Sequence, residues 1–399
     1  MLGARMHRIV WCCALTLGLG AQCGCSDNTR PRPDSGGAPG VAGGGASGSP
    51  TGEGGVSGSG MTYGGTTGQA GVAGQAGVSG SAGNSGGSGG NAGAAGAGLS
   101  AGAAGDSGGT APTLKGPIER NGRCVLEFGD SYFETDPAVA GRIVSARAGS
   151  AEALVPSTVH PENYGSTFWT APQSDWMWPP IAAIDSESYT PAIDVTSCTM
   201  TSTKVIGQEM MIMNDVVIVK KFSPDFDKEA LVVEYTIRNE GTAAKRFAPW
   251  EITRVAPDGL TFFATDAEPT GENKPPVTTA GGAAWYKDSP EIPHDSKLFC
   301  DGKGWIAHVT PGNLLLLKTF PDIAAEQAAP NEAEIEIYTA NNSVARYVEV
   351  ENLGAYEEIA PGASMTWTVH WYVRALPADV AATPGSAELL AFVQQLLSP

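Results

Sequence analysis

A long stretch of small residues sets the first limit on what this chain can fold into. From Ser26 to Thr113 the sequence is mainly Gly, Ala and Ser, and its single aromatic residue is Tyr63. Such a segment has too few large apolar side chains to offset the entropy cost of ordering it. We therefore predict a disordered, flexible tether over 26–113 and a single folded domain over 114–399.

The first 25 residues have the features of an export signal. A basic start precedes an apolar run from Ile9 to Leu19, which is too short to span a bilayer as a helix. The signal ends in Ala21-Gln22-Cys23-Gly24-Cys25, which resembles the lipobox of bacterial lipoproteins. We predict lipidation at Cys25, or alternatively at Cys23, and ordinary cleavage with release is the second alternative. Either outcome places the protein outside the cytoplasm, anchored in the cell envelope or secreted.

The net charge of the chain comes entirely from the folded domain. The chain has a formal net charge of −18, and four basic and four acidic side chains precede residue 115. The domain therefore keeps 20 of the 24 basic and 38 of the 42 acidic side chains. Such a field repels nucleic acid and anionic membrane surfaces, and it favours neutral or cationic partners. We expect no nucleic-acid partner.

Three cysteines remain in the domain, at Cys124, Cys198 and Cys300. In an oxidising compartment this number allows one disulfide and one leftover thiol, with all three pairings open. The cysteines lack the close spacing of a zinc site, so we expect no metal bound by them.

Apolar and polar residues alternate along much of the domain, which predicts β-strands. Gly, Pro, Asn and Asp separate the strands and predict turns. The expected strands include Cys124–Phe128, Val216–Val219, Leu231–Ile237, Leu314–Leu317, Ile335–Ile337 and Trp367–Trp371. A short amphipathic helix is expected near the C-terminus, with Ser386 as its N-cap and with Leu389, Leu390, Val393 and Leu397 on one face. The fold class is therefore all-β, a large antiparallel β-sandwich with a short C-terminal helix.

One loop-like segment, 163–180, is rich in aromatic side chains. It contains three of the nine tryptophans of the chain, together with further aromatic and amide groups. Sugar rings stack on aromatic faces, and their hydroxyl groups need planar hydrogen-bonding partners, so this composition is typical of a carbohydrate site. The expected ligand contacts from the segment are Tyr164, Trp169, Gln173, Trp176 and Trp178. The alternative is that the tryptophans cap the core.

Two further patterns could carry chemistry. In the strand around Trp250, alternation places Trp250 and Arg254 on one side and Glu251 on the other. Carboxylates also recur at every second position in 332–336 and again in 349–351, so one face becomes acidic if these two strands pair. Crowded carboxylates can supply a general base or hold Ca²⁺, but a solvated acidic face is the commoner explanation.

The motifs together resemble a known family. They are Ala140-Gly-Arg-Ile-Val-Ser145, Asn163-Tyr-Gly165, Ala248–Val255, Tyr347–Glu351 and Ala360-Pro-Gly362. This set resembles an uncharacterised bacterial family of the DUF4380 type, related to galactose mutarotases. The resemblance implies the β-supersandwich of aldose 1-epimerases, with a carbohydrate groove across a concave sheet, and it adds Arg142 to the expected ligand contacts. Fold alone does not confer function.

The resemblance also implies a catalytic pair, of which half is present. Glu349 stands twelve residues before Pro361 and matches the mutarotase base, with Glu351 beside it. Trp250 occupies the position where mutarotases carry a histidine, and an indole cannot shuttle a proton at neutral pH. His294 or His370 could substitute for the missing acid.

The sequence therefore predicts an exported carbohydrate-binding protein for a neutral sugar, with ligand contacts that also include Trp250, Glu251 and Arg254. No cofactor is expected, although the carboxylates allow Ca²⁺. The first alternative is a sugar epimerase or mutarotase with Glu349 as general base. The second is a structural envelope protein whose tryptophans are core residues. A lyase acting on uronates is disfavoured, because the domain has almost two acids for each base.

Overall fold

The computed structural model describes residues 116–208, 211–271 and 273–398. The predicted signal, Cys23, Cys25 and the tether lie outside the described residues.

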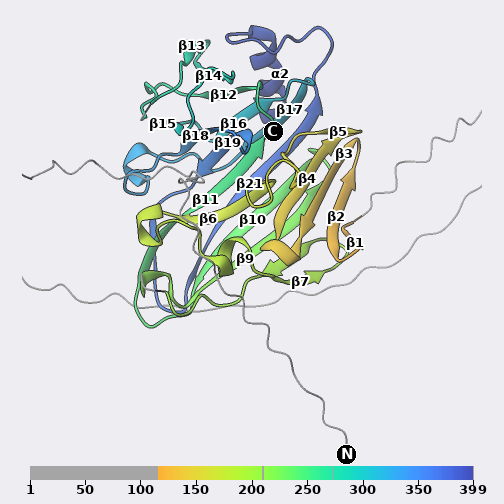
Figure 1. Ribbon diagram of the computed structural model, residues 1–399. Coiled ribbons are helices and arrows are strands. Elements are labelled where there is room, and N and C mark those ends of the chain that lie inside the picture. Colours follow the sequence, from red (N-terminus) through yellow and green to blue (C-terminus); the bar gives the residue numbers. More distant parts are fainter. Residues whose placement is uncertain (1–115, 209–210, 272, 399) are drawn as a thin grey trace, which may run out of the picture. The chain divides into compact units, whose positions relative to one another are not determined.

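Two large antiparallel sheets make up the described part of the chain (Figure 1). The first sheet has eleven strands. Its main path runs β1 (Ile118–Arg120), β2 (Arg123–Phe128), β3 (Ser131–Asp136), β4 (Arg142–Ala148), β6 (Ser166–Ala171), β11 (Lys245–Val255), β19 (Arg346–Leu353), β18 (Ile335–Asn341) and β15 (Ser296–Cys300). Two short strands join this path from the side, β5 (Ala151–Glu152) on β4 and β20 (Glu357–Ile359) on β11.

The second sheet has ten strands and packs against the first. Its order is β13 (Thr278–Ala280), β14 (Ala283–Lys287), β12 (Leu260–Ala264), β16 (Trp305–Val309), β17 (Leu314–Thr319), β21 (Ser364–Ala375), β10 (Ala230–Asn239), β9 (Val216–Asp225), β8 (Cys198–Thr201) and β7 (Thr190–Ile193). The predicted all-β sandwich is confirmed, and each strand expected from the alternating pattern lies within one of these strands.

The core between the sheets is built by the strands' alternation. In β10, Leu231, Val233, Tyr235 and Ile237 are buried, while the residues between them are half-buried. The ring of Tyr235 stacks on that of Phe168 in the first sheet, with centroids 4.5 Å apart. Strand β11 departs from this pattern, because nearly all of its residues are buried on both faces. Some other part of the chain must therefore cover the outer face of the first sheet.

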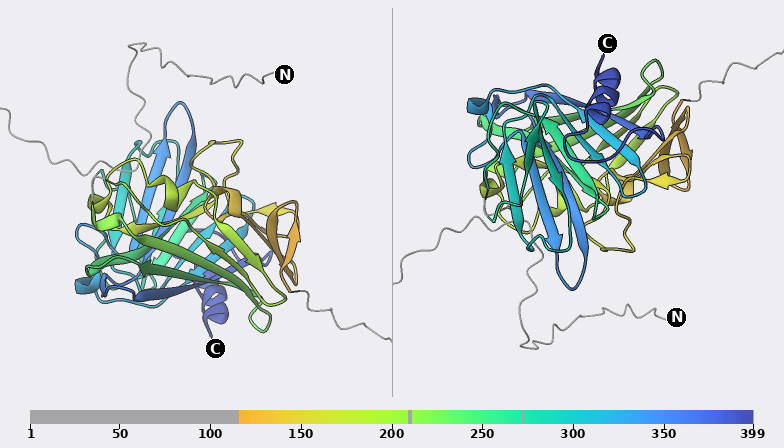
Figure 2. Two further views of the ribbon diagram at one scale, coloured as in Figure 1. Left: turned by 90° about the horizontal axis from the view of Figure 1, so that it is seen from below. Right: turned by 90° about the horizontal axis from the view of Figure 1, so that it is seen from above.

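The predicted C-terminal helix is confirmed as α2 (Ala387–Leu397). The side chain of Ser386 caps it by accepting a hydrogen bond from the backbone N–H of Leu389. Leu389 and Val393 are fully buried against Phe262 and Trp285 of the second sheet. The helix lies at the periphery of the molecule in both views of Figure 2.

The disulfide pairing, which the sequence left open, is Cys124 with Cys198. It links β2 of the first sheet to β8 of the second, and the remaining Cys300 is a buried thiol. One disulfide and one leftover thiol were expected, so that prediction is confirmed. In the described ranges no helix combines the length and the apolar character that a membrane span needs.

The disulfide should contribute strongly to stability. It joins residues 74 apart in sequence, and closing a loop of this length restricts the unfolded chain by about 4 kcal/mol. We expect the double variant Cys124→Ala/Cys198→Ala to lose roughly this amount of unfolding free energy in urea titrations. A reductant should destabilise the unsubstituted protein and leave the double variant unchanged. Equal midpoints for the two proteins without reductant would contradict the prediction.

Candidate functional site

Strand β11 divides the predicted site residues between two environments. Glu251 points between the sheets, where its carboxylate accepts hydrogen bonds from Tyr235 of β10 at 2.5 Å and from Trp371 of β21 at 3.2 Å. The ammonium of Lys318 on β17 lies 3.2 Å from the same carboxylate. Glu251 is therefore a buried core carboxylate, on the opposite side of the sheet from Trp250 and Arg254.

The outer face of β11 carries the predicted base. Arg254 is in register with Glu349 of β19, and its Nε lies 2.9 Å from the Glu349 carboxylate. The neighbouring Glu351 accepts a hydrogen bond from the Trp250 indole at 2.8 Å. Glu349 is completely buried, so its carboxylate is not open to a ligand from solvent.

The two carboxylate-bearing strands pair as the pattern predicted, with Glu336 of β18 opposite Glu351 of β19. The expectation of a solvated acidic face is wrong, because Glu336, Glu349 and Glu351 are all buried. Lys297 of β15 explains how this burial is possible. Its ammonium lies 2.7 Å from Glu336 and 2.9 Å from Glu351. We call Lys297, Glu336 and Glu351 the lysine cluster.

Burial dominates the electrostatics of these carboxylates. It raises the pKa of Glu349, and the charge of Glu351 adds to the effect, while Arg254 opposes it. Burial also raises the pKa of Glu336 well above its usual range, against the attraction of Lys297. Glu336 and Glu349 therefore hold their protons more tightly than solvated carboxylates do.

The tryptophans of the 163–180 segment cover the outer face beside this cluster. Trp169 of β6 contacts Trp176, Trp178 and Trp250 edge to face, with ring centroids 5.4–6.1 Å apart. Trp169 and Trp176 are buried, and their indoles donate to Asp185 and to the Thr170 carbonyl. This arrangement matches the alternative in which the tryptophans cap the core. Of the three tryptophans in the segment, Trp178 alone is half-buried and the other two are buried.

The other predicted contacts hold loops in place. The Arg142 guanidinium pairs with Asp185 of α1 (Ala182–Asp185) at 3.3 Å and lies over the Tyr164 ring at 4.6 Å. Gln173, in the short 3-10 helix η2 (Gln173–Asp175), donates its backbone N–H to Glu332 at 3.0 Å. Asp185 was missed by the sequence analysis, because nothing in the sequence links α1 to β4 and β6.

The two histidines proposed as substitute acids lie in different places. His370 is on β21 of the second sheet, in register with Val232 and Thr319, so it is on the wrong sheet to act with Glu349. His294 lies beside β15, with Nε2 3.1 Å from the Asp295 carboxylate. Asp295 in turn accepts a hydrogen bond from Tyr338, which is in register with Glu349.

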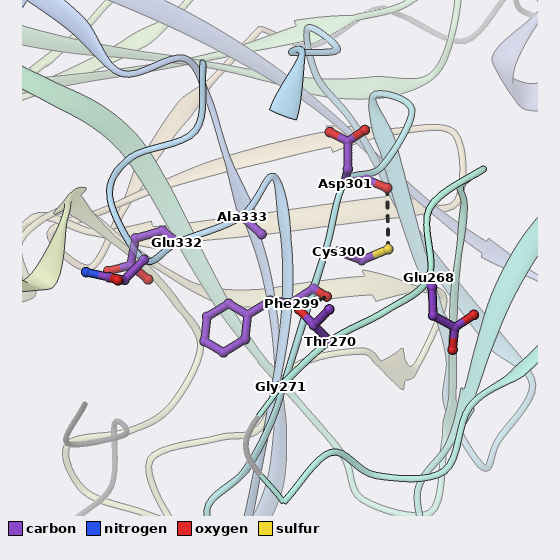
Figure 3. Close-up of a pocket in the computed structure, with 9 residues that line it drawn as sticks. Glu268, Thr270, Gly271, Phe299, Cys300, Asp301, Glu332 and Ala333 are labelled. Carbon is purple, nitrogen blue, oxygen red and sulfur yellow. Dashed lines mark hydrogen bonds between the residues drawn. The ribbon is translucent and has the colours of Figure 1, made fainter. Parts of the chain in front are cut away.

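An open cavity of about 520 Å³ lies beside Phe299, near the end of β15 (Figure 3). Its lining includes Phe299, Glu332, Asp301, Glu268, Thr270 and Asn331. Phe299 is on the same face of β15 as Lys297, whose ammonium lies 5.6 Å from the ring centroid. Within the described residues, no group of three or more His, Cys, Asp or Glu side chains is arranged to hold a metal ion.

Sequence reasoning missed this cavity and, apart from Glu332 and Cys300, the residues that line it. The alternation of 296–300 places Lys297 and Phe299 on one face, which is a signal that the sequence contains. It does not reveal that this strand pairs with β18 and so brings Phe299 beside Glu336. That pairing joins residues that are 35 to 43 positions apart in the chain.

A buried carboxylate also supports the wall of the cavity. Glu334 accepts hydrogen bonds from the backbone N–H groups of Gly302 and Gly304, at 2.8 and 3.1 Å. Burial raises its pKa to about 7, the two N–H donors lower it, and the charges of Asp322 and Asp301 add to the rise. The turn that carries Asp301 is thus held by a group that titrates near neutral pH.

Several solved structures resemble this chain at low sequence identity. A TPR-domain-containing protein from Parabacteroides distasonis is 14% identical, with a TM-score of 0.48; the alignment covers 66% of this chain and 49% of that one. A galactose mutarotase-like protein from Lactobacillus casei is 10% identical, with a TM-score of 0.47; the coverage is 63% of this chain and 100% of that one. A galactose mutarotase related enzyme from Lactobacillus acidophilus is 8% identical, with a TM-score of 0.44; the coverage is 66% and 99%.

This chain therefore spans about half the length of the first of these proteins. No protein-family model matches it, and no curated protein matches it. The resemblance to the DUF4380 type stays a prediction.

The raised pKa of Glu334 predicts how stability depends on pH. Its pKa rises from the usual 4.5 to about 7 on folding. The folded state therefore binds this proton more tightly than the unfolded state does. The resulting stabilisation is complete below about pH 4.5 and is lost as the pH rises through 7. On the order of 3 kcal/mol is involved.

We expect the unfolding free energy of the protein to fall between pH 5 and pH 8 relative to that of Glu334→Gln, as measured by urea titration. The amide cannot ionise, so the unfolding free energy of the variant lacks this pH-dependent contribution. Glu357→Gln, at an exposed position, is the matched control and should follow the unsubstituted protein. Parallel curves for Glu334→Gln and the unsubstituted protein would contradict the assignment.

Proposed function

We propose that this chain is an exported carbohydrate-binding protein, held at the cell envelope by an N-terminal lipid, whose sugar lies in the cavity beside Phe299. The observation that carries the proposal is the composition of that cavity. It combines one aromatic ring with several carboxylate, amide and hydroxyl groups in a space of about 520 Å³. This size lies in the range of small-molecule sites.

A saccharide matches this lining chemically. The C–H face of a pyranose ring stacks on an aromatic ring such as Phe299, which is half-buried and reaches the cavity. The hydroxyl groups of the sugar are both donors and acceptors. Glu332, Asp301 and Asn331 offer planar groups that can accept from them, and Asn331 can also donate.

The buried groups on the outer face of the first sheet support sugar binding better than they support catalysis of anomerisation. A mutarotase needs an accessible base and an accessible acid on opposite sides of the sugar ring. Glu349 is buried against Arg254, and the Trp250 indole is hydrogen-bonded to Glu351. We therefore place the sugar in the open cavity beside Phe299, and not at the site predicted around the tryptophans and Glu349.

Removal of the ring tests the binding site. We expect Phe299→Ala to weaken saccharide binding by roughly 5- to 30-fold, the effect of losing about 1–2 kcal/mol of stacking and apolar burial. The measurement is isothermal titration calorimetry of the purified protein with a panel of neutral mono- and oligosaccharides. Phe392→Ala, a half-buried ring on α2 packed against the second sheet, is the matched control.

Unchanged affinity in Phe299→Ala would rule out this cavity as the binding site. If no saccharide of the panel binds the unsubstituted protein, the carbohydrate proposal itself is wrong.

The lipid anchor needs a separate test in a bacterial host that exports the chain. We expect radiolabelled palmitate to label the protein and the Cys23→Ser variant, and both to fractionate with membranes. Cys25→Ser should lose the label and move to the soluble fraction, because the acylated cysteine is the anchor. Label retained in Cys25→Ser but lost in Cys23→Ser would transfer the anchor to Cys23. An unlabelled, soluble unsubstituted protein would show ordinary secretion instead.

A further inference from the structure

The charges that line the cavity are all of one sign. Glu268, Asp301 and Glu332 contribute three carboxylates, and no basic side chain is among the described residues that line it. A ligand that enters this space meets negative potential on several sides. A carboxylated sugar would be repelled, while a positively charged group would be attracted.

Two basic side chains near the lining, Lys297 and Lys274, are engaged with other groups. The Lys297 ammonium is shared between Glu336 and Glu351, at 2.7 and 2.9 Å. Lys274 donates to the Pro269 carbonyl at 2.8 Å and lies 3.5 Å from Glu268. These cations therefore reduce the negative potential of the cavity only in part.

Glu332 connects the cavity to the buried lysine cluster. Its carboxylate is half-buried and accepts the backbone N–H of Gln173. Burial raises its pKa, Lys297 lowers it, and the charge of Glu351 raises it further. Lys297, which pairs directly with Glu336 and Glu351, therefore also acts electrostatically on Glu332.

The wall opposite Glu332 is also negative. Burial raises the pKa of Asp301, and the charges of Asp322 and Glu326 act in the same direction. Buried Glu334 lies behind the same turn. The excess of negative charge thus extends from the lining into the groups that support it.

We propose that the cavity selects saccharides that carry free amino groups, with the sugar ring on Phe299 and the ammonium groups attracted by the lining carboxylates, Asp301 and Glu332 among them. This inference rests on the proposed function and names the substrate class of the same site. An N-acetylated sugar lacks the charge, and a uronate has the wrong charge. Both should bind more weakly than the amino sugar.

Matched oligosaccharides test the charge alone. We would measure, by calorimetry at pH 6, the binding of β-1,4-linked tetrasaccharides of glucosamine, N-acetylglucosamine and glucose. At this pH the free amines are protonated. We expect the glucosamine tetramer to bind at least about tenfold more tightly than the glucose tetramer at low salt, as for a hydrogen bond to a charged partner. The advantage should shrink as ionic strength rises, because exposed charges are screened.

Variants connect this preference to the cavity. The double variant Asp301→Asn/Glu332→Gln should bring the ratio of the two affinities close to one. The double variant Asp379→Asn/Glu357→Gln, which removes two exposed carboxylates outside the cavity, is the control for net charge and should keep the ratio.

The outcomes separate the inference from the proposed function. Equal or tighter binding of the glucose tetramer overturns the amino-sugar preference and leaves the carbohydrate proposal standing. A ratio that the double variant does not change also overturns the inference, because the preference then arises elsewhere. If none of the three tetrasaccharides binds, the proposed function fails and the inference fails with it.

Discussion

The central strand β11 is buried on both faces, and each face pairs a buried carboxylate with a buried cation. Between the sheets, Glu251 contacts Lys318 at 3.2 Å, and on the outer face Arg254 contacts Glu349 at 2.9 Å. Burying an isolated charge costs several kcal/mol, and only a close partner with further hydrogen bonds offsets that cost. The register of β11 against β19 and the packing of β17 on β11 therefore depend on these pairs being formed. A slip of one residue would exchange the two faces and separate both pairs at once.

Sealing of the outer face decides where a ligand can bind. Trp169 and Trp176, with Asp185 and Arg142, cover the face over β6 and β11. Toward the edge of the first sheet this cover ends, and β15 presents Phe299 to the open cavity. The same face of one sheet thus changes from a closed charge cluster to an accessible lining within two strands. Binding groups and buried charges are neighbours because they share that face.

The sequence predicted the fold well and the burial poorly, for a physical reason. Alternation records which residues share a face of a strand, so the strands, the opposite sides of Trp250 and Glu251, and the helix that Ser386 caps could all be expected. Alternation does not record what covers a face. Glu336 and Glu349 therefore appeared to suit solvent, because their partners Lys297 and Arg254 come from strands far away in the chain. The Cys124–Cys198 pairing could not be predicted for the same reason. It joins two sheets, and the spacing of the cysteines in the sequence does not specify how those sheets pack.

The excess of carboxylates around Lys297 has a consequence for the cavity. Lys297 is the one cation that offsets Glu336 and Glu351 directly and acts on Glu332 electrostatically, so burial and repulsion between the carboxylates raise the pKa of Glu332 and of Glu336. A second positive charge at the mouth of this cluster would stabilise the ionised carboxylates, just as Lys297 does from inside. By linkage, a cation that binds there lowers these pKa values, and deprotonation in turn strengthens cation binding. The electrostatic cost of the buried cluster and the attraction of the cavity for positive charge are therefore two effects of one charge imbalance.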